Sequence, residues 1–231
     1  MINDGDDFLN GQIILINKPI NWTSFQVVKK VRFLIKKKYK LKKLKVGHCG
    51  SLDPLATGLL ILCTGRLTKK ISEIQIQKKK YSGSITLGGS TPSYDLETEI
   101  NKKYETSHIT KDLIYKASRT FIGEVSQYPP AFSALKKDGE RMYEKARRGE
   151  KFVIESRKIK IFNFDILCIN NLTIDFEITC SKGTYIRSIA HDLGTKLNSG
   201  GYLSSLKRIS IGNYNLSDSI CVEDFEKQLF K

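Results

Sequence analysis

The sequence predicts an α+β fold in a single domain spanning residues 1–231, and three observations lead to this prediction. A chain of 231 residues with 40% hydrophobic and 27% charged residues can bury a sizeable core without disulfides or metals. Segments typical of strands and of helices are interspersed without the regular alternation that gives a parallel sheet. No linker rich in Pro, Gly or Ser divides the chain.

The N-terminal part predicts a strand, a turn and a helix. The apolar run Gln12–Ile16 ends in Asn17-Lys18-Pro19, which is typical of a strand followed by a turn. Thr23 and Ser24 are candidate N-caps for the helix that follows. Its apolar side chains recur at helical spacing and are Phe25, Val28, Val31, Leu34 and Ile35.

The remaining elements follow from periodicity. Tyr81, Gly83, Ile85 and Leu87 alternate with polar residues, which predicts a half-buried strand. The other expected elements, in chain order, are a helix over 109–121, an irregular loop over 127–137, a short helix over 139–148, strands over 158–169 and 172–180, a helix over 186–197, and a final strand pair with a terminal helix.

The charge balance is strongly basic, since 39 Lys and Arg outnumber 24 Asp and Glu and give a net charge of +15. Such a charge favours a polyanionic partner, either nucleic acid or an anionic membrane surface, although a compositional bias toward Lys would give the same balance. The run Lys36–Lys45 holds seven lysines in ten residues. This run is either a solvated face or an arm that contacts phosphates.

Several classes are excluded by what the sequence lacks. Its longest apolar run, Leu59–Cys63, is far shorter than the roughly 20 residues of a membrane-spanning helix. The five cysteines show neither CxxC nor Cys/His spacing, which argues against a disulfide framework or a zinc site. The N-terminus is acidic and polar, unlike a signal or transit peptide, so we expect a reducing cytoplasmic location.

Two segments concentrate residues that carry chemistry. In the first, Asp53-Pro54 followed by apolar residues is typical of a helix start, with Asp53 as the N-cap. A carboxylate held at such a helix terminus would also be a positioned nucleophile or general base. In the second, Thr184 is a plausible N-cap that places Arg187 in the first turn, where a cation opposes the helix dipole. Arg187 therefore either has an anionic partner, for which Asp53 is a candidate, or points into solvent.

These segments carry a family resemblance. The segment GHCGSLDPLATGLL, residues 47–60, resembles the catalytic motif of the TruB family of tRNA pseudouridine synthases. Five further elements resemble the family's other motifs in the same order along nearly the whole chain. They are Lys18-Pro19 with Trp22-Thr23-Ser24; Lys80-Tyr81 with Leu87-Gly88; QYPPAFSALK (127–136) with Gly139, Tyr143, Ala146 and Arg147; Gly183-Thr184-Tyr185-Ile186-Arg187 with Asp192-Leu193-Gly194; and Tyr202-Leu203 with Leu206-Lys207-Arg208.

The resemblance implies a role for each matching residue. Asp53 would be the catalytic aspartate and Arg187 the arginine that pairs with it. Tyr81 would stack on the target base, and His48 would hold the RNA loop, whereas an ordinary core or loop position is the alternative for both. Further substrate contacts are implied for Tyr185, Leu206 and Asp95, and RNA contacts are expected for Lys18, Arg208, Lys36, Lys37, Lys42 and Lys43.

The resemblance also implies the fold and the reaction. The fold would be that of pseudouridine synthases, a mixed central sheet flanked by helices with an RNA-binding cleft. The reaction would convert uridine 55 in the T loop of tRNA into pseudouridine after the base is flipped out, without cofactor, metal or guide RNA. The expected partner is the T arm of tRNA rather than DNA or a membrane, and the expected state is a monomer. A C-terminal PUA domain is not expected.

Two alternatives remain, and three positions depart from the family pattern. The chain could be a tRNA-binding or tRNA-folding module with incidental catalysis, or a synthase for another RNA. A glycoside hydrolase is disfavoured, because it would need two catalytic carboxylates flanking the bond. Cys49 and Ser51 stand where the family usually has Thr, and Asn21 stands where it often has Gly.

Overall fold

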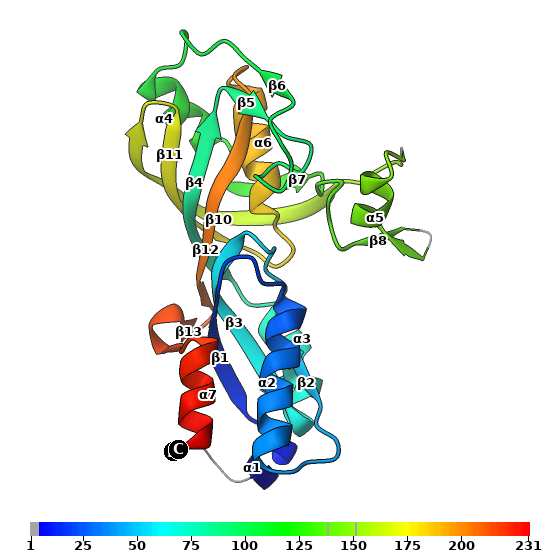
Figure 1. Cartoon of the computed structure of the whole chain (residues 1–231). Helices are drawn as coiled ribbons and strands as arrows, with labels where there is room; N and C mark the ends of the chain where they lie inside the picture. Colours follow the sequence, from blue (N-terminus) through cyan, green and yellow to red (C-terminus); the bar gives the residue numbers. More distant parts are fainter. Residues whose placement is uncertain (1–4, 138, 151) are drawn as a thin grey trace. The chain divides into compact units, whose positions relative to one another are not determined.

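The computed structural model describes residues 5–137, 139–150 and 152–231 (Figure 1). The chain divides into two compact units. The first comprises residues up to Tyr81 together with Leu206–Lys231, and the second comprises Ser82–Ser205. Strands β4 (Lys79–Leu87) and β12 (Gly201–Ile211) each begin in one unit and end in the other. The single domain over residues 1–231 stays a prediction.

The first unit is built around a mixed sheet. β3 (Ala56–Thr64) pairs antiparallel with β1 (Ile13–Lys18) and with β2 (Val46–His48), and it pairs in parallel with β12. This mixture of directions agrees with an α+β fold. Besides its parts of β4 and β12, the unit contains α1 (Gly5–Asn10), β1 (Ile13–Lys18), α2 (Ser24–Lys38), β2 (Val46–His48), β3 (Ala56–Thr64), the 3-10 helix η1 (Gly65–Lys70), α3 (Ile71–Gln75), β13 (Tyr214–Asn215), the 3-10 helix η2 (Leu216–Asp218) and α7 (Val222–Phe230).

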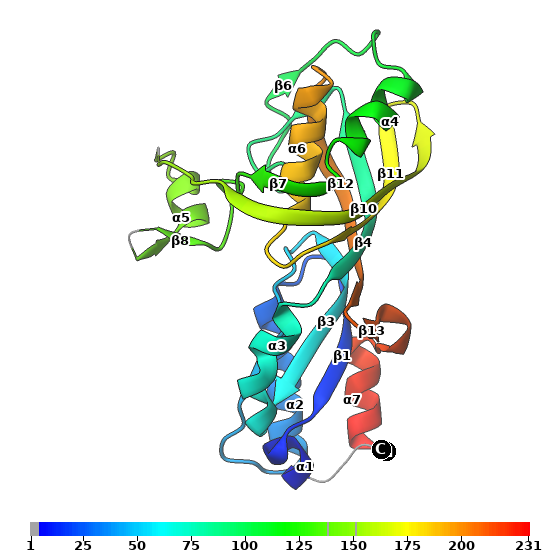
Figure 2. The same ribbon diagram turned by 180° about the vertical axis from the view of Figure 1, so that it is seen from behind.

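Strand β3 is buried on both faces, which explains its continuous apolar sequence. Leu60 and Leu62 pack in one core cluster with side chains of α2 and α7. Leu59, Ile61 and Cys63 pack in a second cluster with Ile74 of α3. Figure 1 shows α2 in front of the strands of this unit, and Figure 2, from behind, shows α3 over β3. The run that the sequence offered as its longest apolar stretch is therefore a central strand.

Helix α2 begins as its sequence predicts. The Thr23 hydroxyl accepts a hydrogen bond from Gln26 N, and the Gln26 side chain accepts one from Thr23 N, which completes a capping box. The predicted apolar positions from Val28 to Ile35 are buried. Phe25 is the exception: it was expected on the same face, yet it is 56% exposed. At about 100° per residue, Phe25 lies outside the face formed by the buried residues of α2.

The helix expected to start at Asp53 is wrong. Residues 51–55 form a loop and turn, closed by a hydrogen bond from Ala56 N to Asp53 O (3.1 Å), and β3 follows directly. The local Asp-Pro signal is overridden by strand pairing, since Ala56, Thr57 and Gly58 lie beside Leu206, Lys207 and Arg208 of β12. Gly58 has φ +99°, and a Cβ there would overlap the backbone of Arg208.

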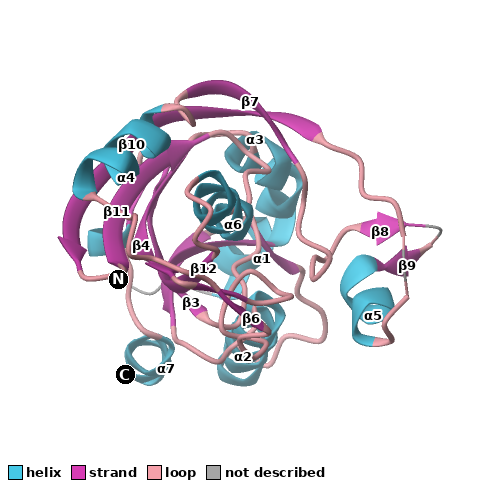
Figure 3. Ribbon diagram, turned by 90° about the horizontal axis from the view of Figure 1, so that it is seen from above, coloured by secondary structure: helices cyan, strands magenta, loops and turns pink. Residues whose placement is uncertain are grey.

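The second unit places helix α6 (Ile186–Lys196) against a curved set of strands (Figure 3). β10 (Arg157–Asn170) pairs antiparallel with β11 (Thr173–Cys180) and with β7 (Gly123–Gln127). Phe164 of β10 packs edge-on against Phe176 of β11. The strands and helices predicted over 109–121, 158–180 and 186–197 are confirmed. The unit also contains β5 (Gly89–Ser90), β6 (Lys102–Lys103), α4 (Lys111–Arg119), β7 (Gly123–Gln127), β8 (Lys136–Lys137), β9 (Glu140–Arg141), α5 (Met142–Arg147), β10 (Arg157–Asn170) and β11 (Thr173–Cys180).

Candidate active site

Asp53 lies on the loop between β2 and β3, and buried polar groups of the first unit hold this loop. Lys18, at the end of β1, is fully buried, and its ammonium donates to the carbonyl oxygens of Pro19 (2.9 Å), Trp22 (2.5 Å) and Pro54 (3.3 Å). Lys18 thus ties the turn after β1 to the residue that follows Asp53. These contacts favour a positioning role over the direct RNA contact expected from the sequence.

Arg208 is the second group that holds the Asp53 loop. Its guanidinium is buried and donates to the carbonyl oxygens of Leu59 (2.7 Å), Ser51 (3.3 Å) and Gly50 (3.0 Å). All three acceptors belong to the segment that flanks Asp53. Because the guanidinium is engaged inside the unit, Arg208 also fits a positioning role better than a phosphate contact.

Ser24 completes the set, and the sequence analysis missed this role. Its hydroxyl donates to Leu52 O (3.1 Å) and accepts from Leu52 N (2.8 Å), one residue before Asp53. The sequence treated Ser24 only as a candidate N-cap, whereas Thr23 is the cap. Its place in the motif Trp22-Thr23-Ser24 was the available signal.

Asn21 explains a departure from the family pattern. Its φ of +64° lies in the left-handed region, which favours glycine but which Asn adopts more readily than most residues. The Asn21 N–H donates to Pro54 O (2.9 Å), so this turn also contacts the Asp53 loop.

The electrostatics around Asp53 are dominated by these buried cations. Burial lowers the pKa of Lys18 to about 8, with the Asp53 carboxylate opposing that shift and Arg208 adding to it. His48, on β2, accepts a hydrogen bond from Gly50 N at Nδ1 (3.3 Å). Burial and the charge of Arg208 lower the pKa of His48, which keeps its ring neutral at pH 7. Positive charge from Lys18 and Arg208 therefore lies next to the loop that carries Asp53.

The other predicted residues of the first unit lie on its strands. Leu206 is half-buried and lies beside Ala56, and Leu206 O accepts from the Thr57 hydroxyl (3.4 Å). Tyr81 is 8% exposed on β4. Cys49 is fully buried with its Sγ 3.5 Å from that of Cys63, and this hydrogen bond, followed by burial, raises the pKa of the Cys49 thiol. The raised pKa disfavours the thiolate that a nucleophilic cysteine needs.

Arg187 of the second unit is buried, so the alternative that it points into solvent is wrong. It lies in the first turn of α6 and donates to Ser93 O (3.0 Å) and Phe132 O (2.9 Å). Its Nε lies 3.6 Å from Oδ2 of Asp95, which is itself 5% exposed. The anionic partner that the helix dipole requires is therefore present within this unit. Asp95 is held in turn by a hydrogen bond from Glu97 N (3.0 Å).

Tyr185 is the N-terminal cap residue of α6, so the prediction of Thr184 as N-cap is wrong. The Thr184 hydroxyl donates to Ser181 O instead (3.0 Å). The Gln127 side chain accepts from Tyr185 N (2.8 Å) and donates to Tyr185 O (3.0 Å). The Arg157 guanidinium lies 4.5 Å from the centre of the Tyr185 ring. These contacts fix the backbone and one face of the ring.

A second cluster accompanies Asp95. Tyr94 has φ +65°, and its ring stacks on His191 of α6 with centroids 3.9 Å apart. Burial lowers the pKa of His191. Burial also raises the pKa of the neighbouring Asp192 to about 6, well above its usual value. The stack anchors the loop that carries Asp95 to the helix that carries Arg187.

The predicted lysines differ in their surroundings. Lys37 lies 5.9 Å from the ring of Phe230 on α7, while Lys42 and Lys43 are exposed and Lys36 is half-buried. Across residues 5–137, 139–150 and 152–231, no group of His, Cys, Asp and Glu could hold a metal ion. In the same ranges, no helix is long and apolar enough to cross a membrane.

Comparison with solved structures defines the class of fold. An H/ACA ribonucleoprotein bound to a substrate RNA containing 2′-deoxyuridine matches over 95% of this chain with a TM-score of 0.68 and 24% identity. A Cbf5–Nop10–Gar1 complex matches over 95% with a TM-score of 0.69 and 25% identity. This chain spans 54% of the matched chain in each. The chain has the α+β fold of the pseudouridine synthases.

Sequence comparison then identifies the family. The model for "TruB family pseudouridylate synthase (N terminal domain)" matches residues 36–186. A protein of Flavobacterium johnsoniae named tRNA pseudouridine synthase B is 52% identical, over 97% of this chain and 98% of its own length. A protein of Phocaeicola vulgatus with the same name is 46% identical, over 96% of this chain and 95% of its own length. The chain belongs to the TruB family of pseudouridylate synthases.

Proposed function

We propose that this protein is a tRNA pseudouridine synthase that isomerises uridine 55 in the T loop of tRNA without a guide RNA. The observation that carries the proposal is the identity of about half of all residues with relatives of that name over nearly their full length. The site is consistent with it, because Asp53 stands on a loop held by Lys18, Ser24 and Arg208. No step of the reaction calls for a metal or cofactor.

The residues have complementary roles in this proposal. The reaction breaks the bond between N1 of uracil and C1′ of ribose, rotates the base and rejoins it through C5. Asp53 is the carboxylate that acts on the flipped-out nucleotide, and Tyr81 stacks on its base. His48 holds the RNA loop, while Leu206 and Tyr185 line the uracil pocket. These roles rest on the motif positions.

Arg187 and Asp95 act together in the second unit. The Asp95 carboxylate and two backbone carbonyls orient the Arg187 guanidinium. In the proposed reaction Arg187 pairs with the Asp53 carboxylate and orients it. Asp53 and Arg187 belong to different units, so this pairing stays a prediction from the motifs.

The partner is the T arm of tRNA, and the protein acts as a monomer in the cytoplasm. Free thiols at all five cysteines support a reducing compartment. The net charge of +15 supplies affinity for RNA phosphates, with Lys36, Lys37, Lys42 and Lys43 as candidates.

The test is release of tritium from C5-labelled uridine in unmodified tRNA. We expect the wild type to release tritium and Asp53→Asn to release none, with tRNA binding within a few-fold of wild type. Asp112→Asn, an exposed carboxylate on α4, is the matched control and retains full release. Tight binding without release by the wild type would favour an RNA-binding or RNA-folding module. Full release by Asp53→Asn would remove Asp53 from its role.

A further inference from the structure

The first unit contains a basic hollow of about 400 Å³. Lys43 and Lys45 line it from the loop before β2, and Arg66 and Lys69 line it from η1. All four side chains are exposed. Among the residues that the structure describes, none of the four forms an ion pair with a carboxylate. We call these four residues the basic pocket.

The backbone beneath the basic pocket is fixed. Leu44 is buried in the core, so its neighbours Lys43 and Lys45 lie on the outer side of the loop. The loop before β2 and the start of η1 are joined by a hydrogen bond from Gly65 N to Lys45 O (2.9 Å). Gly65 has φ +50°, and a Cβ there would overlap the Leu9 carbonyl of α1. The Thr68 hydroxyl donates a hydrogen bond to Gly65 O (2.8 Å). The backbone that carries the four cations is therefore held by hydrogen bonds and close packing.

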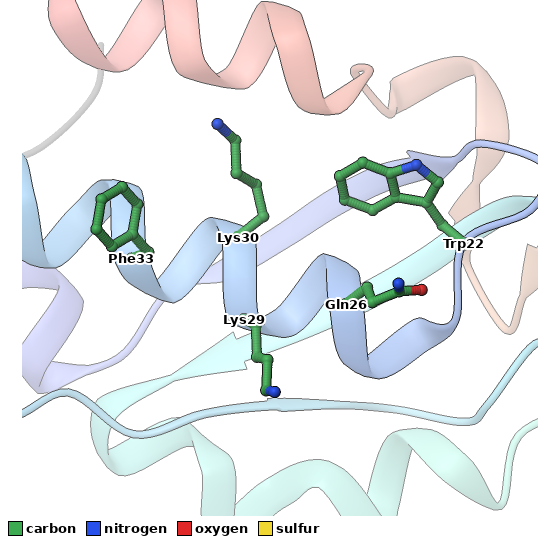
Figure 4. Close-up of a pocket in the computed structure, with 5 residues that line it drawn as sticks. All are labelled: Trp22, Gln26, Lys29, Lys30 and Phe33. Atoms are coloured by element: carbon green, nitrogen blue, oxygen red, sulfur yellow. The ribbon is translucent and has the colours of Figure 1, made fainter.

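A second hollow, on α2, shows a different arrangement of cations (Figure 4). Trp22 and Phe33 contribute apolar surface to it, and Lys30 forms an ion pair with Glu226 (2.7 Å). Lys29 lies 4.9 Å from the centre of the Phe25 ring. Both cations thus have a partner within the protein. The basic pocket instead gathers four like charges, which repel one another unless an external anion joins them.

The basic pocket lies far from Asp53 within the same unit. Asp53 precedes the first residue of β3, Ala56, and Gly65 follows its last residue, Thr64. A nine-residue strand rises roughly 30 Å at about 3.3 Å per residue. The phosphate of a uridine bound at Asp53 therefore cannot reach the basic pocket.

We propose that the basic pocket binds backbone phosphates of the tRNA substrate outside the T loop, an inference that rests on the proposed function. Lys and Arg side chains supply most of the affinity for an RNA backbone, independently of sequence. Folded RNA is recognised largely by shape and by phosphate contacts. The pocket thereby adds a second point of attachment that distinguishes a whole tRNA from its T arm alone.

The test compares two substrates and two double variants. Arg66→Gln with Lys69→Gln removes two charges from the pocket. Lys111→Gln with Lys116→Gln removes two exposed charges from α4 of the second unit and is the control. On full-length tRNA, we expect the pocket variant to raise KM about tenfold with kcat unchanged, while the control stays near wild type. On an isolated T-arm hairpin, both variants match the wild type. Equal losses on both substrates, or a tRNA KM no higher than that of the control, would overturn the proposal.

A binding measurement separates this proposal from the proposed function. The pocket variant should show a salt dependence of tRNA affinity less steep by about one to two in the log–log slope. This measurement needs no turnover, so it decides the role of the pocket even if the wild type releases no tritium. An unchanged slope would show that the pocket does not touch phosphates.

Discussion

The two units each bury an arginine, but they surround it differently. Arg208 of the first unit donates to three backbone carbonyls, and among the described residues no carboxylate forms an ion pair with it. Arg187 of the second unit donates to two carbonyls and lies 3.6 Å from the Asp95 carboxylate. In the first unit the charge of Arg208 thus remains next to the Asp53 loop. In the second unit the Asp95 carboxylate neutralises the charge of Arg187. In the proposed function, the positive charge of Arg208 lies in the unit whose Asp53 acts on the RNA.

The largest effect is expected from Arg208→Met. The substitution leaves the carbonyls of Gly50, Ser51 and Leu59 without their donor, and we expect the free energy of unfolding to fall by about 3–5 kcal/mol. Urea denaturation measures it, with the exposed Arg119→Met as the control. A loss below about 1 kcal/mol would show that Arg208 does not hold the loop.

Asp95→Asn tests the ion pair between Asp95 and Arg187 in the second unit. The amide keeps the acceptor for Glu97 N but removes the charge opposite Arg187, so we expect a loss of about 1.5–3 kcal/mol. Tritium release should fall as well, because Arg187 loses its orienting partner. Wild-type stability and turnover in this variant would mean that the two backbone carbonyls suffice to hold the guanidinium.

Ser24→Ala tests the hydroxyl that holds the Asp53 loop without any charge. Leu52 N and Leu52 O lose their partner, which costs about 1–2 kcal/mol. We expect kcat to fall more than KM rises, since the loop carries Asp53. Ser217→Ala, at an exposed serine, is the control and should change neither stability nor kcat.

We expect the smallest change in the free energy of unfolding, about 1 kcal/mol, from Asp192→Asn, and we expect this change to depend on pH. Burial in the folded protein raises the pKa of Asp192 from 3.8 to about 6. Between about pH 4 and pH 6 the folded protein therefore binds a proton at Asp192 more tightly than the unfolded chain does. Stability supplied by this group is present below pH 4 and is lost as the pH rises to 6. The variant should lack this decline in thermal unfolding across that range. An identical pH profile in both proteins would contradict the assignment.

The sequence predicts a structural element correctly where that element depends on residues close together in the chain. The helix after Thr23 is predictable, because its cap and its partner Gln26 lie three residues apart. The strand after Asp53 was not, since it depends on pairing with β12, some 150 residues later. The burial of Lys18 and Arg208 escaped prediction for the same reason: charged residues are normally exposed, and these two are satisfied by carbonyls of a distant loop.

The division into units also orders events during synthesis. The second unit is one uninterrupted stretch, and its last residue, Ser205, emerges from the ribosome before the first unit is complete. Until then β3 lacks its parallel neighbour, and the core beside Leu60 lacks Val222, Phe225 and Leu229 of α7. Domains usually close in the order in which they are translated. Here the second unit, which is inserted into the first, can fold first. The first unit, which contains Asp53, can complete its fold only after β12 and α7 have been synthesised.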